Sequence, residues 1–400
     1  NMTQLAERTK LIKPSVTLAI AAKAGKLRAE GVDIVNFSAG EPDFDTPERI
    51  KAAAVEALRK GMTKYTDVKG IEPLREAITE KYRREYGLSY RKEDVLVSCG
   101  AKHSLYNVLQ AVVNPGDEVV IPSPYWVSYS DMALLAGGVP KLIPTGEATG
   151  FRMKPAELEA ALTPRTRVVL LNSPCNPTGA SYDRDELLAI AQVLEKHSCL
   201  ILADDIYDKI VYDGFVVHNL VALCPALRDR TIIVNGVSKS YAMTGWRIGY
   251  ALGPADVIAA AAKIQSQSTS NPTSFAQAGA LEAIRGPQDE LPIMVREFAR
   301  RRSVIVSLMN GIRGIHCLKP QGAFYVFPNV SGLFGKKTTA GKQLQTPCDV
   351  ADYLLEEAKV AAVPGEDFGS QEHIRFSYAT SLEDIEKGCK RIQQAVAKLG

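Results

Sequence analysis

The chain has 400 residues, a formal net charge of +3 at pH 7, 46% hydrophobic residues and 23% charged residues. This profile is typical of a soluble globular protein with two domains, or with one large domain and a smaller companion. It disfavours nucleic-acid binding, which needs a clustered basic face, and no apolar run is long enough to span a membrane. We expect a cytoplasmic protein, or an organellar one if a transit peptide has been removed, because the N-terminus lacks the apolar segment of a secretory signal.

The N-terminal part, roughly through residue 45, differs in character from the rest of the chain. Thr46 and Pro47 are the predicted N-cap and first-turn residues of a helix over ERIKAAAVEALRK. The middle of the chain alternates short apolar strands with amphipathic helices, as βαβ units do. The predicted strands are DVLVSCG, EVVIPSP, TRVVLLNSP, SCLILADD, RTIIVNG and WRIGYALG, with helices over KHSLYNVLQAVV and DRDELLAIAQVLEKH. The fold class is therefore α/β, with a mostly parallel sheet flanked by helices.

The C-terminal part predicts a smaller α+β domain. A long basic helix, MVREFARRRSVIVSLMNGI, precedes strands FYVF, KVAAVPG and HIRFSYA and a closing helix, and GKKTTAGKQLQTP is a polar surface loop. The N-terminal segment can pack with this part. We therefore expect a large domain over residues 46–290 and a discontinuous small domain over residues 1–45 and 291–400.

The cysteines and histidines give no sign of a metal site. Seven cysteines are scattered along the chain without a CxxC pair, and the five histidines lack metal-binding spacing. This pattern favours free thiols in a reducing compartment over disulfides or zinc, and we expect no metal.

Polar residues follow four of the predicted strands, and ligands of open parallel sheets bind beyond such strand ends. These stretches are Gly100-Ala101-Lys102, NSPCNPTG over 172–179, DDIY over 204–207, and Ser238-Lys239. Each alone has an ordinary explanation as a turn, a cap or a surface cation. Together they match the needs of pyridoxal 5′-phosphate, which requires a lysine for an imine, a carboxylate for its ring nitrogen and a helix N-terminus for its phosphate. Ser238 and Arg247 can add a hydroxyl and a charged fork to the phosphate site.

The sequence resembles the fold-type-I, class I pyridoxal-phosphate aminotransferases. Within them it is most similar to the bacterial-type aspartate aminotransferases, a subgroup that also holds prephenate aminotransferases. The resemblance runs nearly end to end, through KPSVTLAIAAKA, AGEPDFDTP, TKYTDVKGIEPLREA, NSPCNPTG, DDIYDKIVYDG, SKSYAMTGWRIGY, PQGAFYVF, VPGEDFG and IRFSYA. Two residues depart from the family pattern. Cys175 stands where Asn or Ser is usual and Asp205 where Glu is usual, and neither replaces a reacting group.

The resemblance implies a seven-stranded-type sheet of the pyridoxal-phosphate transferase fold and a complete cofactor site. Lys239 would be the Schiff-base lysine and proton shuttle, Asp204 would pair with the pyridine nitrogen, and Tyr207 would bond the 3′ oxygen. The remaining cofactor contacts would come from Asn176 at the same oxygen, Trp126 stacked on the ring, and Ala101, Lys102, Ser238 and Arg247 at the phosphate. Tyr65 would reach the phosphate of the neighbouring subunit, which implies a homodimer with a shared active site.

The resemblance also implies where a substrate binds. Arg375 would hold the α-carboxylate, helped by Asn176 and the backbone of Gly40, beside Trp126. A mid-strand arginine is costly unless paired, which agrees with carboxylate binding. The side chain of Lys102, with Ser15 and Thr17, would grip a second carboxylate, although helix capping explains the two hydroxyl residues nearly as well.

The predicted function is amino-group transfer between L-aspartate, or glutamate, and 2-oxoglutarate or oxaloacetate. The alternatives are a glutamate/aspartate–prephenate aminotransferase, a broader aromatic aminotransferase, and a carbon–sulfur lyase on the same scaffold. The expected partners are amino acids and 2-oxo acids, with no nucleic acid and no membrane. A nicotinamide dehydrogenase is disfavoured because no GxGxxG follows a predicted strand.

Overall fold

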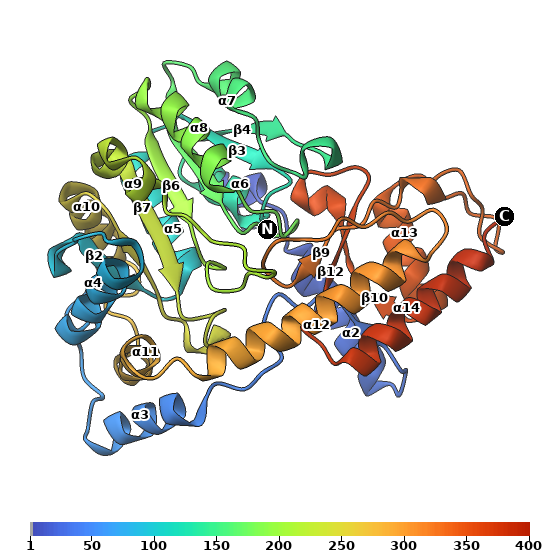
Figure 1. Ribbon diagram of the computed structural model, residues 1–400, viewed down its shortest axis with the longest axis horizontal. Helices are drawn as coiled ribbons and strands as arrows, with labels where there is room; N and C mark the ends of the chain where they lie inside the picture. Colours follow the sequence, from blue (N-terminus) through green and yellow to red (C-terminus); the bar gives the residue numbers. More distant parts are fainter. Residues whose placement is uncertain (1–2) are drawn as a thin grey trace.

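The computed structural model describes residues 3–400, so residues 1 and 2 of the predicted N-terminal segment lie outside the described residues. The chain forms two lobes of unequal size (Figure 1). The large lobe contains the main sheet and the helices around it. The small lobe contains the three C-terminal helices and the N-terminal helix α2 (Val16–Ala29).

The large lobe is built on a seven-stranded sheet with the strand order β2-β8-β7-β6-β5-β3-β4. All neighbouring pairs are parallel except the two that involve β8, which is antiparallel to β2 and to β7. The strands are β2 (Val95–Ser98), β3 (Glu118–Ser123), β4 (Val139–Pro144), β5 (Thr166–Asn172), β6 (Leu200–Asp204), β7 (Thr231–Gly236) and β8 (Gly249–Leu252). The predicted α/β class and the mostly parallel sheet are confirmed.

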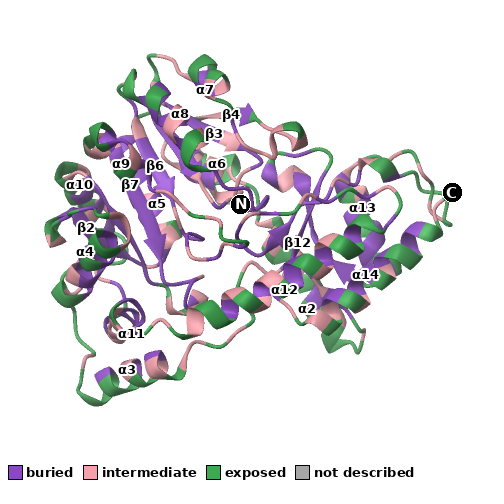
Figure 2. Cartoon of the chain, in the orientation of Figure 1, coloured by how far each residue is buried: buried purple, intermediate pink, exposed green. Residues whose placement is uncertain are grey.

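The central strands are apolar because helices cover both faces of the sheet. Figure 2 shows the central strands as buried, with exposed residues on the outer sides of the helices. The helices of this lobe are α3 (Glu48–Arg59), α4 (Glu72–Tyr86), α5 (Ala101–Val112), α6 (Ser128–Leu135), α7 (Pro155–Ala161), α8 (Arg184–Glu195), α9 (Leu220–Leu223), α10 (Ala255–Ser266) and α11 (Ser274–Arg285).

The small lobe combines short strands with long helices. Its helices are α2, α12 (Glu290–Asn310), α13 (Pro347–Tyr353) and α14 (Leu382–Ala397), and its strands are β1 (Val35–Asn36), β9 (Tyr325–Val326), β10 (Val360–Ala361), β11 (Val363–Pro364) and β12 (Ile374–Ser377). The N-terminal strand β1 pairs in parallel with β10, which joins the two ends of the sequence. The N-terminal segment also contacts α12 through an ion pair at 2.7 Å between Asp43 and Arg301.

The short helix α1 (Arg8–Leu11) lies against α6 of the large lobe. Packing of the N-terminal segment is therefore shared between the two lobes.

Two local predictions are corrected, and one strand was missed. Thr46 is not the N-cap, because Pro47 occupies that position of α3 and makes no side-chain capping bond. The Thr46 hydroxyl instead donates to Ala242 O at 2.6 Å and accepts from Trp246 Nε1 at 3.0 Å. The segment KVAAVPG forms two short strands, β10 and β11, that belong to different sheets. The edge strand β4 was not predicted, because its residues are largely exposed and it contains two prolines, which only an edge strand tolerates well.

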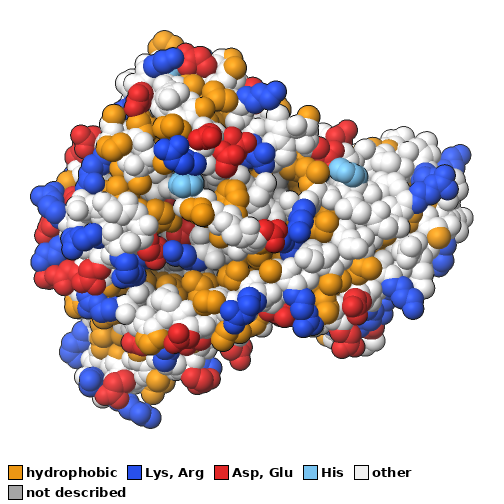
Figure 3. Space-filling view, viewed as in Figure 1, with side chains coloured by type: hydrophobic (Ala, Val, Ile, Leu, Met, Phe, Trp, Pro, Cys, Tyr) orange, Lys and Arg blue, Asp and Glu red, His pale blue; other side chains and the backbone are white. Residues whose placement is uncertain are grey.

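The predicted polar loop after α12 forms an exposed turn with an antiparallel bridge between Lys337 and Gln343. All seven cysteines are free, as expected. Among residues 3–400, no group of three or more His, Cys, Asp or Glu side chains is arranged to hold a metal ion. Within the same residues, no helix combines the length and the apolar character that a membrane crossing requires. Lys and Arg side chains are interspersed with Asp and Glu over both lobes on the face shown in Figure 3.

Candidate active site

A cavity of about 620 Å³ opens at the carboxyl edge of the main sheet, where the two lobes meet. Its size lies in the range of small-molecule sites. Thirteen of the fourteen residues that the sequence predicted for the site line it: Ser15, Thr17, Gly40, Ala101, Lys102, Trp126, Asn176, Asp204, Tyr207, Ser238, Lys239, Arg247 and Arg375. The structure thus brings together residues from both ends and the middle of the chain.

Tyr65 is the exception. It does not line the cavity of this chain, and 91% of its surface is exposed. Its predicted role requires a second copy of the protein.

Lys239 follows the last residue of β7 by three positions and extends its amine into the cavity. Its Nζ donates a hydrogen bond to the carbonyl oxygen of Gly40 and lies 5.7 Å from the ring centre of Tyr207. Burial, reinforced by the nearby Arg375 guanidinium, lowers the pKa of Lys239 to about 8, although Glu41 and Asp204 act in the opposite direction. An amine with this pKa holds a usable neutral fraction close to pH 7.

Asp204 is the last residue of β6 and is 3% exposed. Its Oδ2 accepts a hydrogen bond from the hydroxyl of Tyr129 at 2.5 Å, and its Oδ1 accepts from the backbone N–H of Ile206 at 3.2 Å. Burial raises the pKa of Asp204 to about 6, while these two donors and Lys239 oppose that rise. The neighbouring β5 holds this strand end, since Asn172 Nδ2 donates to Asp204 O at 3.0 Å.

An anion cradle lies where α5 begins. Gly100, with φ of +93°, precedes the helix. Because the first N–H groups of a helix have no partner within it, those of α5 can bind an anion. The guanidinium of Arg247 donates to Thr244 O at 2.7 Å and to Cys99 O at 3.4 Å, which holds it beside the same helix start. The packing is tight, because a Cβ on Gly100 would lie 2.3 Å from Arg247 Nη2 and one on Gly249 would lie 2.1 Å from Ala101 N.

Arg375 lies on β12 and is 2% exposed. Its Nη1 donates to Asn176 Oδ1 and its Nη2 donates to Ser38 O, both at 3.0 Å, and its guanidinium lies 4.5 Å from the ring centre of Tyr325. Because a guanidinium has five N–H donors, the remaining ones are free for a ligand. Among the described residues, no carboxylate forms an ion pair with the Arg375 guanidinium.

Tyr207 and Tyr325 share a hydrogen bond of 2.7 Å between their hydroxyls, and either oxygen can be the donor. Burial raises the pKa of Tyr207 well above its usual value, so the phenol stays protonated. The hydroxyl therefore remains available as a donor next to the cavity.

The outer part of the cavity carries the residues predicted for a second carboxylate. Lys102 places its Nζ 4.8 Å from the ring centre of Trp126. Ser15 caps α2 by accepting from Leu18 N at 3.3 Å, and it also lines the cavity, so the capping explanation is observed and the contact to a second carboxylate stays a prediction. Thr17 lines the cavity from the first turn of the same helix.

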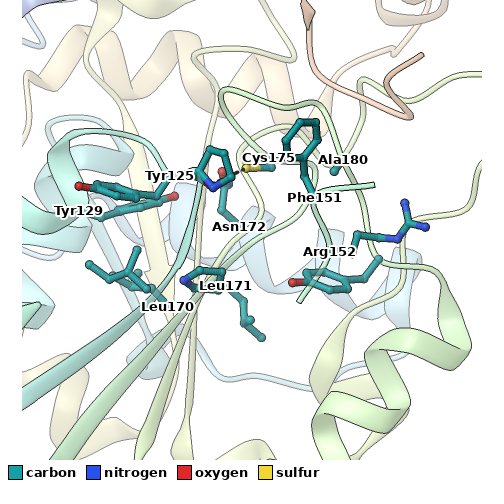
Figure 4. Close-up of a pocket in the computed structure, with 13 residues that line it drawn as sticks. Tyr125, Tyr129, Phe151, Arg152, Leu170, Leu171, Asn172, Cys175 and Ala180 are labelled. Carbon is teal, nitrogen blue, oxygen red and sulfur yellow. Dashed lines mark hydrogen bonds between the residues drawn. The ribbon is translucent and has the colours of Figure 1, made fainter. Parts of the chain in front are cut away.

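The two departures from the family pattern lie behind the cavity. Cys175 lines a small separate pocket together with Tyr125, Asn172 and Phe151 (Figure 4). Burial raises the pKa of its thiol, which disfavours the reactive thiolate. Burial likewise raises the pKa of Asp205, whose carboxyl also faces Asp204 and Asp208.

Sequence reasoning missed several residues of the site. Lys13, Tyr129 and Tyr325 all line the cavity. Tyr129 follows Trp126 by three positions and donates its backbone N–H to Trp126 O, and this spacing was the one available signal. The contacts of Lys13 and Tyr325 depend on segments far apart in sequence, so no local pattern marks them.

An amine, a buried carboxylate and a guanidinium with N–H groups to spare line one cavity of this α/β protein, which suits a site for a small molecule that carries a carboxylate. A family model described as aminotransferase class I and II matches residues 32–392. The chain therefore belongs to the class I and II aminotransferase family and is an aminotransferase.

Individual relatives match over the full length. The chain is 50% identical to the aspartate/prephenate aminotransferase of Cereibacter sphaeroides, over 100% of both chains. It is 48% identical to the aspartate aminotransferase of Rhizobium meliloti, over 99% of this chain and 97% of that one.

Solved structures agree in fold. The aspartate aminotransferase from Rhizobium meliloti superimposes with a TM-score of 0.97 at 47% identity, over 100% of both chains. The aspartate aminotransferase from Thermus thermophilus with maleate gives a TM-score of 0.92 at 42% identity, over 98% of this chain and 100% of that one.

Proposed function

We propose that the protein is a pyridoxal-phosphate-dependent aminotransferase that moves the amino group between L-aspartate, or glutamate, and 2-oxoglutarate or oxaloacetate. The observation that carries the proposal is the convergence of Lys239, Asp204 and Arg375 on one cavity. The names of the full-length relatives support it, since they include aspartate aminotransferase.

The residues present fit this cofactor. The free N–H groups of α5, Ser238 and Arg247 form a cradle of the kind that binds phosphate, and the glycines at 100 and 249 let Arg247 and the start of α5 pack closely around it. Asp204 would face the ring nitrogen, Asn176 and Tyr207 the 3′ oxygen, and Trp126 the ring. When bound, the cofactor supplies an aldehyde that takes up the amino group and a protonated ring that withdraws electrons from the substrate Cα.

Lys239 performs the proton transfer. Its lowered pKa of about 8 would let the amine take a proton from the substrate Cα and then deliver that proton to the former aldehyde carbon of the cofactor. The hydrogen bond to Gly40 O and the neighbouring Tyr207 ring restrict where the amine lies. Asp204, held by two donors, supplies the negative charge that keeps the ring nitrogen protonated.

Arg375 orients the substrate. Its two bonds to Asn176 and Ser38 fix the plane of the guanidinium, so that the remaining N–H groups can bind the α-carboxylate in a fork. A fixed carboxylate also fixes the direction of the Cα–H bond relative to Lys239.

The second carboxylate of aspartate or glutamate would bind at the outer end of the cavity, where Lys102 and the hydroxyls of Ser15 and Thr17 lie. Prephenate also carries a second carboxylate, and one relative is named for both substrates. We therefore keep the glutamate/aspartate–prephenate aminotransferase as the second candidate function.

We further propose a homodimer with shared active sites. Tyr65 is almost fully exposed, and the apolar side chains of Val55 and Leu58 on α3 are each 43% exposed. A second copy that covers this surface would bring Tyr65 to the partner's phosphate cradle. In the same proposal, the two lobes are the domains 46–290 and 1–45 with 291–400.

A substrate panel tests the proposed function. Aspartate, glutamate, phenylalanine and cystathionine serve as donors against 2-oxoglutarate, oxaloacetate and prephenate, with Lys239→Ala as the inactive control. The proposal expects glutamate from aspartate and 2-oxoglutarate. A strong preference for prephenate over oxaloacetate would replace it by the second candidate, and pyruvate from cystathionine would make the protein a carbon–sulfur lyase.

A further inference from the structure

A buried tyrosine touches the carboxylate on which the proposed chemistry depends. Tyr129 lies in the first turn of α6, and its hydroxyl donates to Asp204 Oδ2 at 2.5 Å. Tyr129 is 2% exposed and Asp204 is 3% exposed, so both partners of this bond are buried. Figure 4 shows Tyr129 at one end of the small pocket behind the site, with Asn172 and Cys175 between it and Arg152.

The Asp204 carboxylate has one donor at each oxygen. Oδ1 accepts from the backbone of Ile206, which lies two residues beyond the strand end, and Oδ2 accepts from Tyr129, 75 residues earlier in the chain. Two donors at opposite oxygens fix the rotation of the carboxyl group. The Tyr129 hydroxyl is the only one of the two that a side-chain substitution can remove.

The same hydrogen bond opposes the cost of burying a charge. Burial raises the pKa of Asp204 to about 6, and the Tyr129 hydroxyl acts to lower that pKa. Burial also raises the pKa of Tyr129 well above its usual value, so the phenol remains a donor at every pH of interest. Removal of the hydroxyl would therefore favour the protonated, neutral form of Asp204.

The aromatic ring of Tyr129 contributes packing that does not depend on the hydroxyl. The rings of Tyr129 and Trp126 meet edge to face with centres 5.4 Å apart, and the backbone N–H of Tyr129 donates to Trp126 O at 3.0 Å. A phenylalanine keeps the ring and this packing while it removes the hydroxyl. The two contributions of Tyr129 can thus be separated.

We propose that Tyr129 is a positioning residue for Asp204: its hydroxyl fixes the orientation of the carboxylate and keeps it ionised, so that it can pair with a protonated pyridine nitrogen. This inference rests on the proposed function. It adds a residue that acts on the cofactor through its hydrogen bond to Asp204.

The test compares Tyr129→Phe with Tyr182→Phe. Tyr182 is a matched control because it is 7% exposed and lines the same small pocket, while its hydroxyl accepts from Met153 N at 3.0 Å and has no bond to Asp204. The measurement is the dissociation constant of pyridoxal 5′-phosphate from the full chain between pH 5.5 and 9. Y129F should weaken binding by about 10- to 100-fold at pH 7, the range of a hydrogen bond to a charged group, and should move the pH of half-maximal affinity up by about one unit. Y182F should stay within about twofold of the wild type, the scatter of a neutral substitution.

A carbocyclic analogue separates positioning from simple structural support. With 1-deazapyridoxal phosphate, which lacks the ring nitrogen, the difference between Y129F and the wild type should fall below about threefold, because Asp204 then has no cation to pair with. If Y129F proves unstable, 3-fluorotyrosine at position 129, a stronger donor, should shift the pH midpoint downward.

The outcomes distinguish the two levels of the proposal. An unchanged affinity and pH midpoint in Y129F, or an equal loss with the deaza analogue, would overturn the role of Tyr129 alone. Failure of the wild-type chain to bind pyridoxal 5′-phosphate at any pH would overturn the proposed function and this inference with it.

Discussion

Arg375 offers the sharpest test of substrate recognition. The guanidinium is buried, is held by Asn176 and Ser38, and keeps free N–H groups at the cavity. Each hydrogen bond from a charged donor contributes about 1.5–3 kcal/mol, so a two-bond fork to a carboxylate contributes about 3–6 kcal/mol. Arg375→Ala should therefore lower kcat/KM for aspartate by about 10²–10⁴-fold.

Arg375→Lys separates charge from geometry. A lysine keeps the positive charge but cannot form the planar fork, so the loss should be about one bond, or roughly 10- to 100-fold in kcat/KM. Both variants are assayed with aspartate and 2-oxoglutarate, and thermal unfolding checks that the protein remains folded.

A second buried arginine is the control for these variants. Arg302 on α12 is 2% exposed, pairs with Asp213 at 2.6 Å and donates to Pro320 O at 2.8 Å, but it does not line the cavity. Arg302→Lys should lower the melting temperature while kcat/KM stays within about threefold. A loss below tenfold in folded Arg375→Ala would show that this guanidinium does not hold the substrate carboxylate.

The geometry of the site supports three further predictions. Burial lowers the pKa of Lys239 from 10.5 to about 8, so between these pH values the unfolded cofactor-free chain binds more protons than the folded one, and the free energy of unfolding should rise with pH. Lys239→Met should remove this rise and add up to ~3 kcal/mol to the free energy of unfolding at pH 7. Urea unfolding at several pH values measures both effects. Gly249→Ala should destabilise the protein by about 1–3 kcal/mol and weaken phosphate binding, because the new Cβ would lie 2.1 Å from Ala101 N, whereas Gly245→Ala has nothing within 4 Å and should be neutral by thermal unfolding. Lys102→Ala should reduce kcat/KM for aspartate about tenfold relative to that for phenylalanine, and equal losses for both substrates would assign Lys102 to the cofactor instead.

The sheet could be predicted from the sequence because its central strands are apolar on both faces and end in polar residues. Asp204 and Lys239 were found for that reason, since each lies at or just beyond the end of such a strand. The edge strand β4 lacked this signal, because one side of an edge strand is open to solvent and tolerates prolines.

The partners of the site residues could not be predicted in the same way. The bond between Tyr129 and Asp204 spans 75 residues, and Arg375 meets Ser38 across 337 residues. The sequence predicted Thr46 as a helix N-cap, but its hydroxyl forms hydrogen bonds with Ala242 and Trp246, which tertiary packing brings next to it. Such contacts depend on how the lobes fold together, which local patterns do not encode.

The proposed chemistry depends above all on a covalent bond between the amine of Lys239 and an aldehyde cofactor. Borohydride reduction of the protein saturated with pyridoxal 5′-phosphate, followed by peptide mass spectrometry, detects that bond. We expect one phosphopyridoxyl group per chain, on Lys239, and none on that position in Lys239→Ala. Labelling spread over surface lysines, with Lys239 unmodified, would contradict the proposed role of this amine.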